Sequence, residues 1–119
     1  MKYLLVFGSL RKNSKRGYNY DRFGKGSQKY IKDVELNDFE MYNLGSYPAI
    51  CKGKGKIKCE LHEVEDTAAH SIERMEIGSG YDGMTIKTQL EDKIIDATIY
   101  TWPKERLTRF PKVESGNWF

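Results

Sequence analysis

The residue types best suited to chemistry are a glutamate near the end of a predicted helix and a glycine–serine turn near the start of the chain. Ile72 and Met75 follow the three- and four-residue spacing of an amphipathic helix, and Glu76 falls on the same stripe. A carboxylate on the apolar side of a helix loses hydration, which raises its pKa and makes it a better base. At the edge of the stripe, Glu76 would instead be exposed beside Glu73 and Arg74. Periodicity alone leaves both interpretations open.

The glycine–serine turn lies in the stretch VFGSLRKN, from Val6 to Asn13. The apolar run Tyr3 to Phe7 predicts a short buried strand, and Gly8 ends it. The turn can be a plain exit from that strand. It can also be a loop that holds a ligand against backbone N–H groups.

Other catalytic patterns fail on spacing. Ser9, Asp96 and two histidines are present, but Ser9 lacks the second glycine of a nucleophile elbow. The GKGK stretch at residues 53–56 lacks the spacing and the hydroxyl of a phosphate-binding loop, and it predicts a flexible, solvated loop. Cys51 and Cys59 are interpreted as two ordinary thiols, with neither a disulfide nor a metal site expected.

Composition indicates one folded domain over residues 1–119, with 39% hydrophobic and 13% aromatic residues. No apolar run approaches the roughly 18 residues of a membrane span. The start MKYLLVF is too short for a secretory signal, so we expect a cytoplasmic protein. The net charge is +3, with basic residues gathered in Arg11–Lys32 and Lys52–Lys58. These runs could contact phosphates, but a solvated basic face is favoured and nucleic acid is an unlikely partner.

Strands dominate the rest of the chain. Alternation predicts a strand from Gln28 to Leu36, a turn at Asn37-Asp38 and a second strand from Phe39, which together would form a hairpin. A further strand is predicted from Ile57 to Val64, with the odd positions facing the core. Two closing strands are predicted over Tyr81–Gln89 and Lys93–Trp102.

Two other segments complete the predicted order. Asp66-Thr67 would cap the helix that ends at Gly78–Gly80. Ser14 to Phe23 reads as a short helix or an ordered loop. The pattern of elements indicates an α+β domain or a partly closed barrel.

Four stretches together resemble the γ-glutamylcyclotransferase-like superfamily, which includes AIG2-like proteins and γ-glutamylamine cyclotransferases. VFGSLRKN resembles its opening signature, and MYNLGSYPAICKGKGKIKCELHEV resembles its central segment. HSIERMEIGSGY resembles its acidic helix end, and VESGNW is similar to the ending of small bacterial members. The stretches occur in the family order and span essentially the whole chain.

The resemblance implies a small mixed β-barrel with flanking helices and a cavity at one mouth. It implies cyclisation of a γ-glutamyl amine or amide to 5-oxoproline with release of the amine, without a metal or organic cofactor. Glu76 would be the general acid/base. The substrate-binding residues would be Phe7, Gly8, Ser9, Leu10, Arg11, Tyr47 and Tyr81. Pro48, Tyr100 and Trp118 are further candidates for the cavity wall.

Three functions remain in view. The first is this enzyme, acting on a small γ-glutamyl compound. The second is a non-catalytic member that binds a small anionic metabolite or a protein partner in the same cavity. A basic module that contacts nucleic acid ranks well below both.

Overall fold

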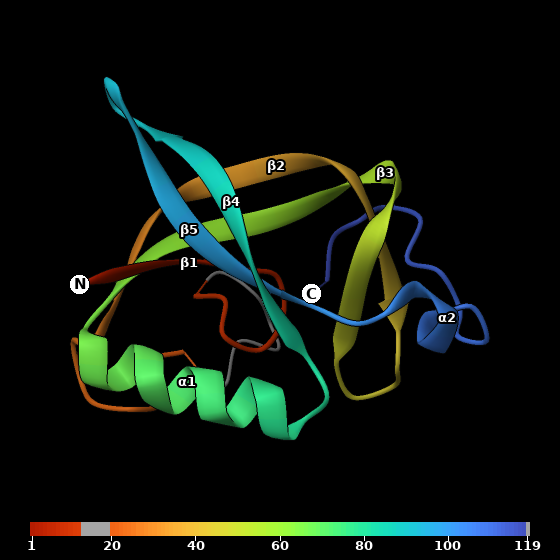
Figure 1. Ribbon diagram of the computed structural model, residues 1–119, viewed down its shortest axis with the longest axis horizontal. Helices are drawn as coiled ribbons and strands as arrows, with labels where there is room; N and C mark the ends of the chain where they lie inside the picture. The colour runs from red at the N-terminus through yellow and green to blue at the C-terminus, as the bar shows by residue number, and fades with distance from the viewer. Residues whose placement is uncertain (13–19, 119) are drawn as a thin grey trace.

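Five strands and two helices make up the chain in a computed structural model that describes residues 1–12 and 20–118. The strands form one sheet in the order β2-β3-β1-β5-β4 (Figure 1). The elements are β1 Lys2–Val6, β2 Gln28–Asn43, β3 Pro48–Val64, α1 Asp66–Gly78, β4 Asp82–Leu90, β5 Lys93–Thr101 and α2 Lys104–Leu107. Most of the predicted helix or loop at Ser14–Phe23 lies outside the described residues.

Strand β1 is the centre of the sheet, as its apolar sequence predicts. It pairs antiparallel with β3 along its whole length, from Lys2 opposite Val64 to Val6 opposite Glu60. On its other side it pairs parallel with β5 at Leu4 and Thr98. Because β1 is paired on both sides, the position of the turn that follows it is fixed at the end of the sheet.

Strands β2 and β3 form one long hairpin, and this corrects two predictions. Asn37-Asp38 is not a turn: Asp38 has φ 67° within β2, at an irregularity in the strand pairing. The lysine–glycine stretch is not a loop but part of β3, where residues 53–55 lie opposite Asp38. A Cβ on Gly53 would come within 2.3 Å of the Glu40 side chain, and a Cβ on Gly55 would lie 2.9 Å from the Phe39 carbonyl oxygen, so glycine lets β3 lie close to β2 here.

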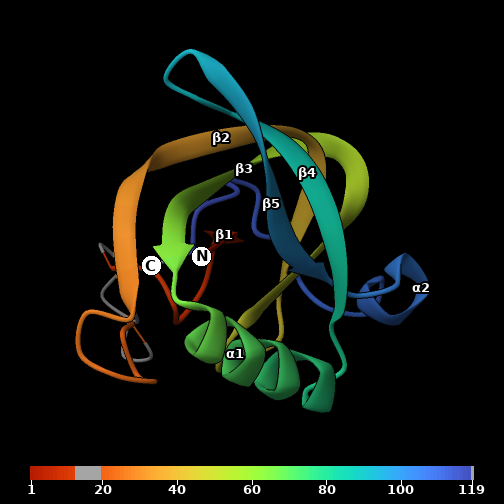
Figure 2. The same cartoon turned by 60° about the vertical axis from the view of Figure 1, so that its left-hand side comes forward.

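Helix α1 lies beside the curved sheet (Figure 2). Ala68 and Ile72 are buried on its inner face. It begins one residue earlier than the predicted cap: Glu65 is the N-cap residue and makes no side-chain capping bond. Asp66 in the first turn pairs with the N-terminal amine at 2.8 Å.

The α+β class is confirmed, and the two closing strands form the predicted hairpin, β4 with β5. The sheet is open rather than a closed barrel, because β2 and β4 are its edges and no ladder joins them among the described strands. One side-chain hydrogen bond links the two edge strands: Lys32 Nζ of β2 donates to the Gln89 carbonyl of β4 at 2.7 Å. No helix in the described parts of the chain is long and apolar enough to cross a membrane.

Candidate active site

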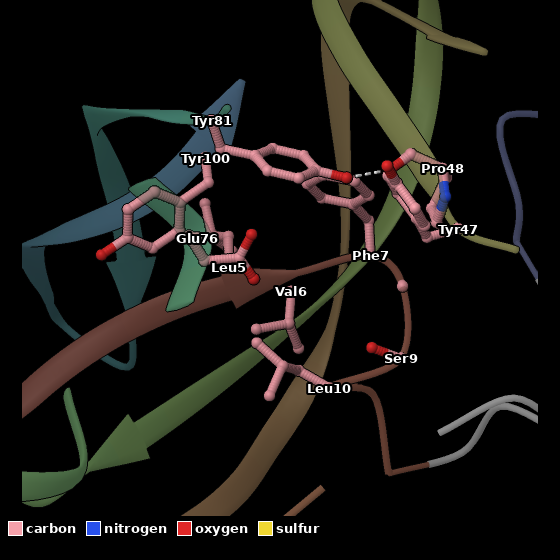
Figure 3. A pocket seen from close by; sticks show the side chains of 11 residues that line it. Leu5, Val6, Phe7, Ser9, Leu10, Tyr47, Pro48, Glu76, Tyr81 and Tyr100 are labelled. Atoms are coloured by element: carbon pink, nitrogen blue, oxygen red, sulfur yellow. Dashed lines mark hydrogen bonds between the residues drawn. The ribbon is translucent and has the colours of Figure 1, made fainter. Parts of the chain in front are cut away.

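A small pocket opens at the carboxyl end of β1, between that strand, the end of α1 and the start of β3 (Figure 3). Its volume is about 50 Å³. A single water needs roughly 10–15 Å³ by the same measure, so the pocket suits a small polar head group. It is lined by Leu5, Val6, Phe7, Gly8, Ser9, Leu10, Tyr47, Pro48, Glu76, Tyr81 and Tyr100.

The turn after β1 forms one wall of the pocket. The Arg11 N–H donates to the Gly8 carbonyl at 3.0 Å, which closes the turn over Ser9 and Leu10. A Cβ on Gly8 would lie 3.1 Å from two ring atoms of Pro48. Glycine at this position therefore lets the turn pack against the first residue of β3. The sequence does not predict this contact between the turn and Pro48.

Glu76 lies in the last turn of α1, and its carboxylate points into the pocket (Figure 3). Its neighbours Glu73 and Arg74 are exposed, whereas Glu76 is half-buried. The structure thus favours the inward of the two orientations that periodicity left open. Burial raises the pKa of the Glu76 carboxyl from its usual 4.5 to about 7. The end of a helix also disfavours negative charge, and no basic residue lies in this last turn.

Two buried tyrosines complete the wall around Glu76. The Tyr81 hydroxyl donates to the Pro48 carbonyl at 2.6 Å, so its proton is already engaged. Burial, together with the charge of Glu76, raises the pKa of Tyr81 well above its usual range. Burial and the nearby Glu73 and Glu76 carboxylates raise the pKa of Tyr100 to about 12. Both side chains are therefore neutral at physiological pH.

Tyr47 lies at the mouth of the pocket and is 39% exposed. Its ring centroid is 6.4 Å from that of Tyr81. Of the residues that the sequence placed at the site, the structure brings together the glutamate, the turn residues 7–10 and the tyrosines 47 and 81.

Arg11 and Trp118 lie away from the pocket. Arg11 is only 9% exposed, and its Nη1 donates to Asn117 Oδ1 at 2.8 Å and to the Trp118 carbonyl at 2.6 Å. The guanidinium is drawn to these acceptors and to the Glu60 carboxylate, 3.5 Å from its Nε. This corrects the expectation that Arg11 adds charge beside a substrate. Trp118 is a buried core residue.

A buried polar cluster behind the turn is the feature that sequence reasoning missed. Glu60 and His62 are both 0% exposed, although strand alternation placed them on the polar face of β3. Both faces of β3 are covered here, because the rings of Tyr20 and Tyr30 pack edge-on against His62. The available signal was two polar residues two apart in a strand, on either side of the apolar Leu61.

The cysteines and possible metal ligands bear on other chemistries. Cys51 and Cys59 are buried free thiols. Burial raises the pKa of Cys59 to about 12, which leaves it protonated and unreactive. Within residues 1–12 and 20–118, no group of histidine, cysteine and acidic side chains is arranged to hold a metal ion.

Comparison with known proteins agrees with this fold. A relative from Pyrococcus horikoshii, provisionally named a gamma-glutamylcyclotransferase, is 29% identical over 114 residues, which is 96% of this chain and 88% of that protein. Its crystal structure superposes with a TM-score of 0.74 at 25% identity, covering 98% of this chain and 89% of that one.

Two more distant relatives extend the comparison. The family protein YtfP of Escherichia coli K12 is 23% identical over 97% of this chain and 94% of its own length. An AIG2-like protein from Mus musculus has the same fold, with a TM-score of 0.76 at 16% identity over 96% of this chain and 86% of that one. The profile of the family described as "Gamma-glutamyl cyclotransferase, AIG2-like" matches residues 4–119. The chain therefore belongs to the gamma-glutamyl cyclotransferase, AIG2-like family.

Proposed function

We propose that this protein cyclises a γ-glutamyl amine or amide to 5-oxoproline and releases the amine, with Glu76 as general acid and base. The observation that carries the proposal is the Glu76 carboxyl, whose pKa burial raises to about 7, in a pocket walled by the turn after β1. A pKa near the working pH is the best compromise between holding a proton and giving it up.

The bond changes balance without a further reactant. The α-ammonium of the substrate gives a proton to Glu76, and the free amine attacks the γ-carbonyl carbon to form the new C–N bond. Glu76 returns that proton to the leaving nitrogen as the original C–N bond breaks. The ring nitrogen still carries one proton more than the lactam does, and it gives this second proton to the Glu76 carboxylate, which passes it to the released amine. The products are 5-oxoproline and the amine as its ammonium ion. One carboxyl in a single position can serve both steps, because the two nitrogens are bonded to the same carbon in the intermediate.

Positioning supplies the other part of catalysis. The attack is intramolecular, so the enzyme must hold the glutamyl chain folded back on itself. The backbone N–H groups of the turn, from Gly8 to Leu10, would receive the α-carboxylate of the substrate. In that arrangement the adjacent α-amine would face the carboxyl group of Glu76, which also lines the pocket.

The dimensions of the pocket bear on the leaving group. A volume of about 50 Å³ suits the glutamyl head rather than a whole dipeptide. The amine portion would therefore extend outwards past the exposed ring of Tyr47.

The test is a panel assay for 5-oxoproline with γ-glutamyl amino acids and γ-glutamyl-ε-lysine, with Glu76→Gln as the control. We expect product from at least one substrate and loss of at least about 100-fold in kcat in Glu76→Gln, the usual contribution of a general base. Equal activity in the variant would refute the role of Glu76. Binding of 5-oxoproline without turnover of any substrate would support the non-catalytic alternative.

A further inference from the structure

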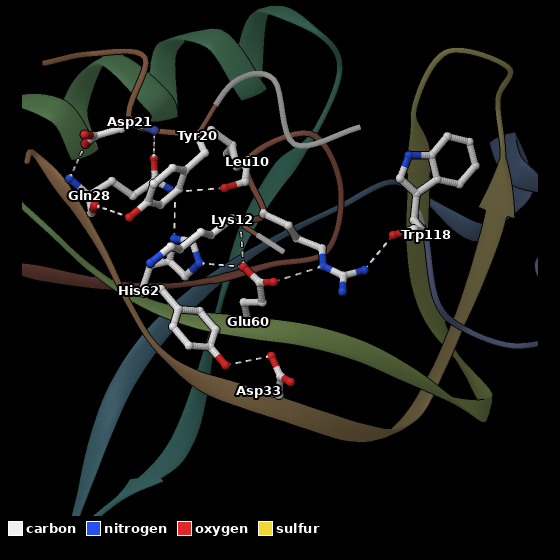
Figure 4. Close-up of polar contacts among 11 residues, drawn as sticks. Leu10, Lys12, Tyr20, Asp21, Gln28, Asp33, Glu60, His62 and Trp118 are labelled. Carbon is white, nitrogen blue, oxygen red and sulfur yellow. Dashed lines mark hydrogen bonds and ion pairs between the residues drawn. The ribbon is translucent and has the colours of Figure 1, made fainter. Parts of the chain in front are cut away.

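The backbone at the end of the pocket turn, from Leu10 to Lys12, is hydrogen-bonded to buried side chains that do not line the pocket. Gln28 Nε2 of β2 donates to the Leu10 carbonyl at 3.1 Å, and the Lys12 N–H donates to Glu60 Oε1 of β3 at 2.7 Å (Figure 4). Gln28 is 2% exposed and Glu60 is 0% exposed. Water competes poorly for these two buried side chains, so their bonds restrain the backbone at Leu10 and Lys12.

His62 links these two holding residues to each other. Its Nε2 lies 2.9 Å from Glu60 Oε1 and its Nδ1 lies 2.8 Å from Gln28 Nε2. A carboxylate oxygen flanked by donors accepts, so Nε2 carries the proton and Nδ1 accepts from the Gln28 amide. The two amide hydrogens of Gln28 are then both committed, one to His62 and one to Leu10. The Asp21 N–H donates to Gln28 Oε1 at 3.2 Å, which agrees with this orientation of the amide.

The positive guanidinium of Arg11 compensates the negative charge of the buried Glu60 carboxylate. Its Nε lies 3.5 Å from Glu60 Oε2, and its Nη1 is bonded to the chain end at Asn117 and Trp118. The turn is thus connected in one network to β2, to β3 and to the C-terminal segment. Burying so many polar groups gains little stability over an apolar core of the same shape, which points to a role in fixing geometry.

We infer that Gln28, Glu60 and His62 are positioning residues, which fix the backbone of Leu10 to Lys12 and so hold the Gly8–Leu10 N–H groups where the carboxylate of the substrate binds. This inference rests on the proposed function, because it takes the turn as the carboxylate-binding element. Gln28 and Glu60 bond the backbone of Leu10 and Lys12, and His62 bonds these two side chains. None of the three lines the pocket. Their loss acts on substrate binding, whereas the loss of Glu76 acts on proton transfer.

Steady-state kinetics of Gln28→Met test the inference. Methionine fills the same volume but donates no hydrogen bond to Leu10. The exchange also removes the bonds of Gln28 to His62 and to the Asp21 N–H. We expect KM to rise about three- to tenfold, the effect of losing the one bond that Gln28 makes to the backbone of the turn, with kcat within about twofold of the wild type. A purely structural role would reduce the amount of folded enzyme, which lowers apparent kcat and leaves KM unchanged. Gln89→Met, the same exchange at an exposed site on β4, is the matched control and should leave both constants unchanged.

Amide hydrogen exchange by NMR separates this inference from the proposed function. In the wild type the Lys12 amide should exchange slowly, and in Glu60→Met, which removes its acceptor, about tenfold faster. A Lys12 amide that exchanges at the rate of an unstructured chain in the wild type would overturn the inference, even if cyclisation is observed. An unchanged KM in folded Gln28→Met would overturn it as well. A slow Lys12 amide in a protein that forms no 5-oxoproline would remove the proposed function and leave the fixed turn standing.

Discussion

The Tyr81 hydroxyl donates to the Pro48 carbonyl at 2.6 Å, while the Tyr81 backbone N–H donates to the Glu76 carbonyl at 3.0 Å. One residue therefore joins the end of α1, where the carboxyl group lies, to the start of β3. Pro48 in turn packs against Gly8. The relative position of the glutamate and the turn depends on this connection, although the two come from opposite sides of the pocket.

Tyr81→Phe should lower the free energy of unfolding by about 1–3 kcal/mol, because it leaves the buried Pro48 carbonyl without its donor. Urea denaturation followed by circular dichroism measures this change. Tyr47→Phe is the matched control at the exposed mouth of the pocket, and its unfolding free energy should stay within about 0.5 kcal/mol of the wild type. Equal effects of the two substitutions would show that the bond to Pro48 contributes nothing to stability.

Glu76→Gln should stabilise the protein in a pH-dependent way. Because the folded-state pKa of Glu76 is about 7 and the usual value is 4.5, the unfolded chain releases this proton first as pH rises. The native glutamate thus adds no penalty below about pH 4.5, and its full penalty applies above about pH 7. This difference between the two pKa values lowers the free energy of unfolding by at most about 3 kcal/mol.

Unfolding free energies of the wild type and Glu76→Gln, measured at pH 4.5 and pH 8, check this sign. The variant should be the more stable protein at pH 8, and the difference should shrink towards pH 4.5. An increase in unfolding free energy that is the same at both pH values would show that the charge of Glu76 is not its cause. Glu73→Gln, an exposed acid one turn earlier, provides the control.

The rate of cyclisation should follow the same carboxyl group. Glu76 must be ionised to accept the proton of the ammonium, so kcat/KM should rise with pH and level off above an apparent pKa of about 7. The 5-oxoproline assay from pH 5 to pH 8.5 measures this profile. A rise centred near pH 4.5 would mean that the carboxyl is hydrated in the free enzyme, contrary to its placement in the pocket.

Periodicity and composition anticipate the elements of this fold that have one buried face. The apolar run of β1, the stripe of α1 and the hairpin of β4 and β5 all follow from spacing. The candidate residues at the two ends of the pocket were also identifiable, because family motifs in order select Gly8 and Glu76 together. The orientation of the Glu76 side chain could not be predicted. Whether it points inwards depends on how α1 packs against the sheet, and no local sequence pattern indicates this.

The failures have equally local causes. Lysine and glycine at residues 52–56 resemble a loop, but they belong to β3. A Cβ at Gly53 would clash with the Glu40 side chain of β2, and one at Gly55 would crowd the Phe39 carbonyl. Arg11 resembles a substrate-binding charge because it follows the turn, yet long-range acceptors at Asn117 and Trp118 draw it away. Contacts between residues more than 100 positions apart in the chain cannot be read from spacing.

Gly8→Ala should impair the site without removing any polar group. The added methyl would lie 3.1 Å from Cγ and Cδ of Pro48, closer than ordinary van der Waals contact, so the turn or the proline ring must shift. Overpacking of this kind typically lowers the free energy of unfolding by about 1–3 kcal/mol. Displacement of the turn should also raise KM in the 5-oxoproline assay.

The matched control for Gly8→Ala is Gly78→Ala, at the end of α1. A Cβ on Gly78 would have no neighbour within 4 Å, and the residue lies in the helix without a positive φ. Alanine there should therefore stabilise the protein by about 0.5–1 kcal/mol and leave KM unchanged. If Gly8→Ala matched this control in stability and in KM, the packing of the turn on Pro48 would not determine how the pocket binds its substrate.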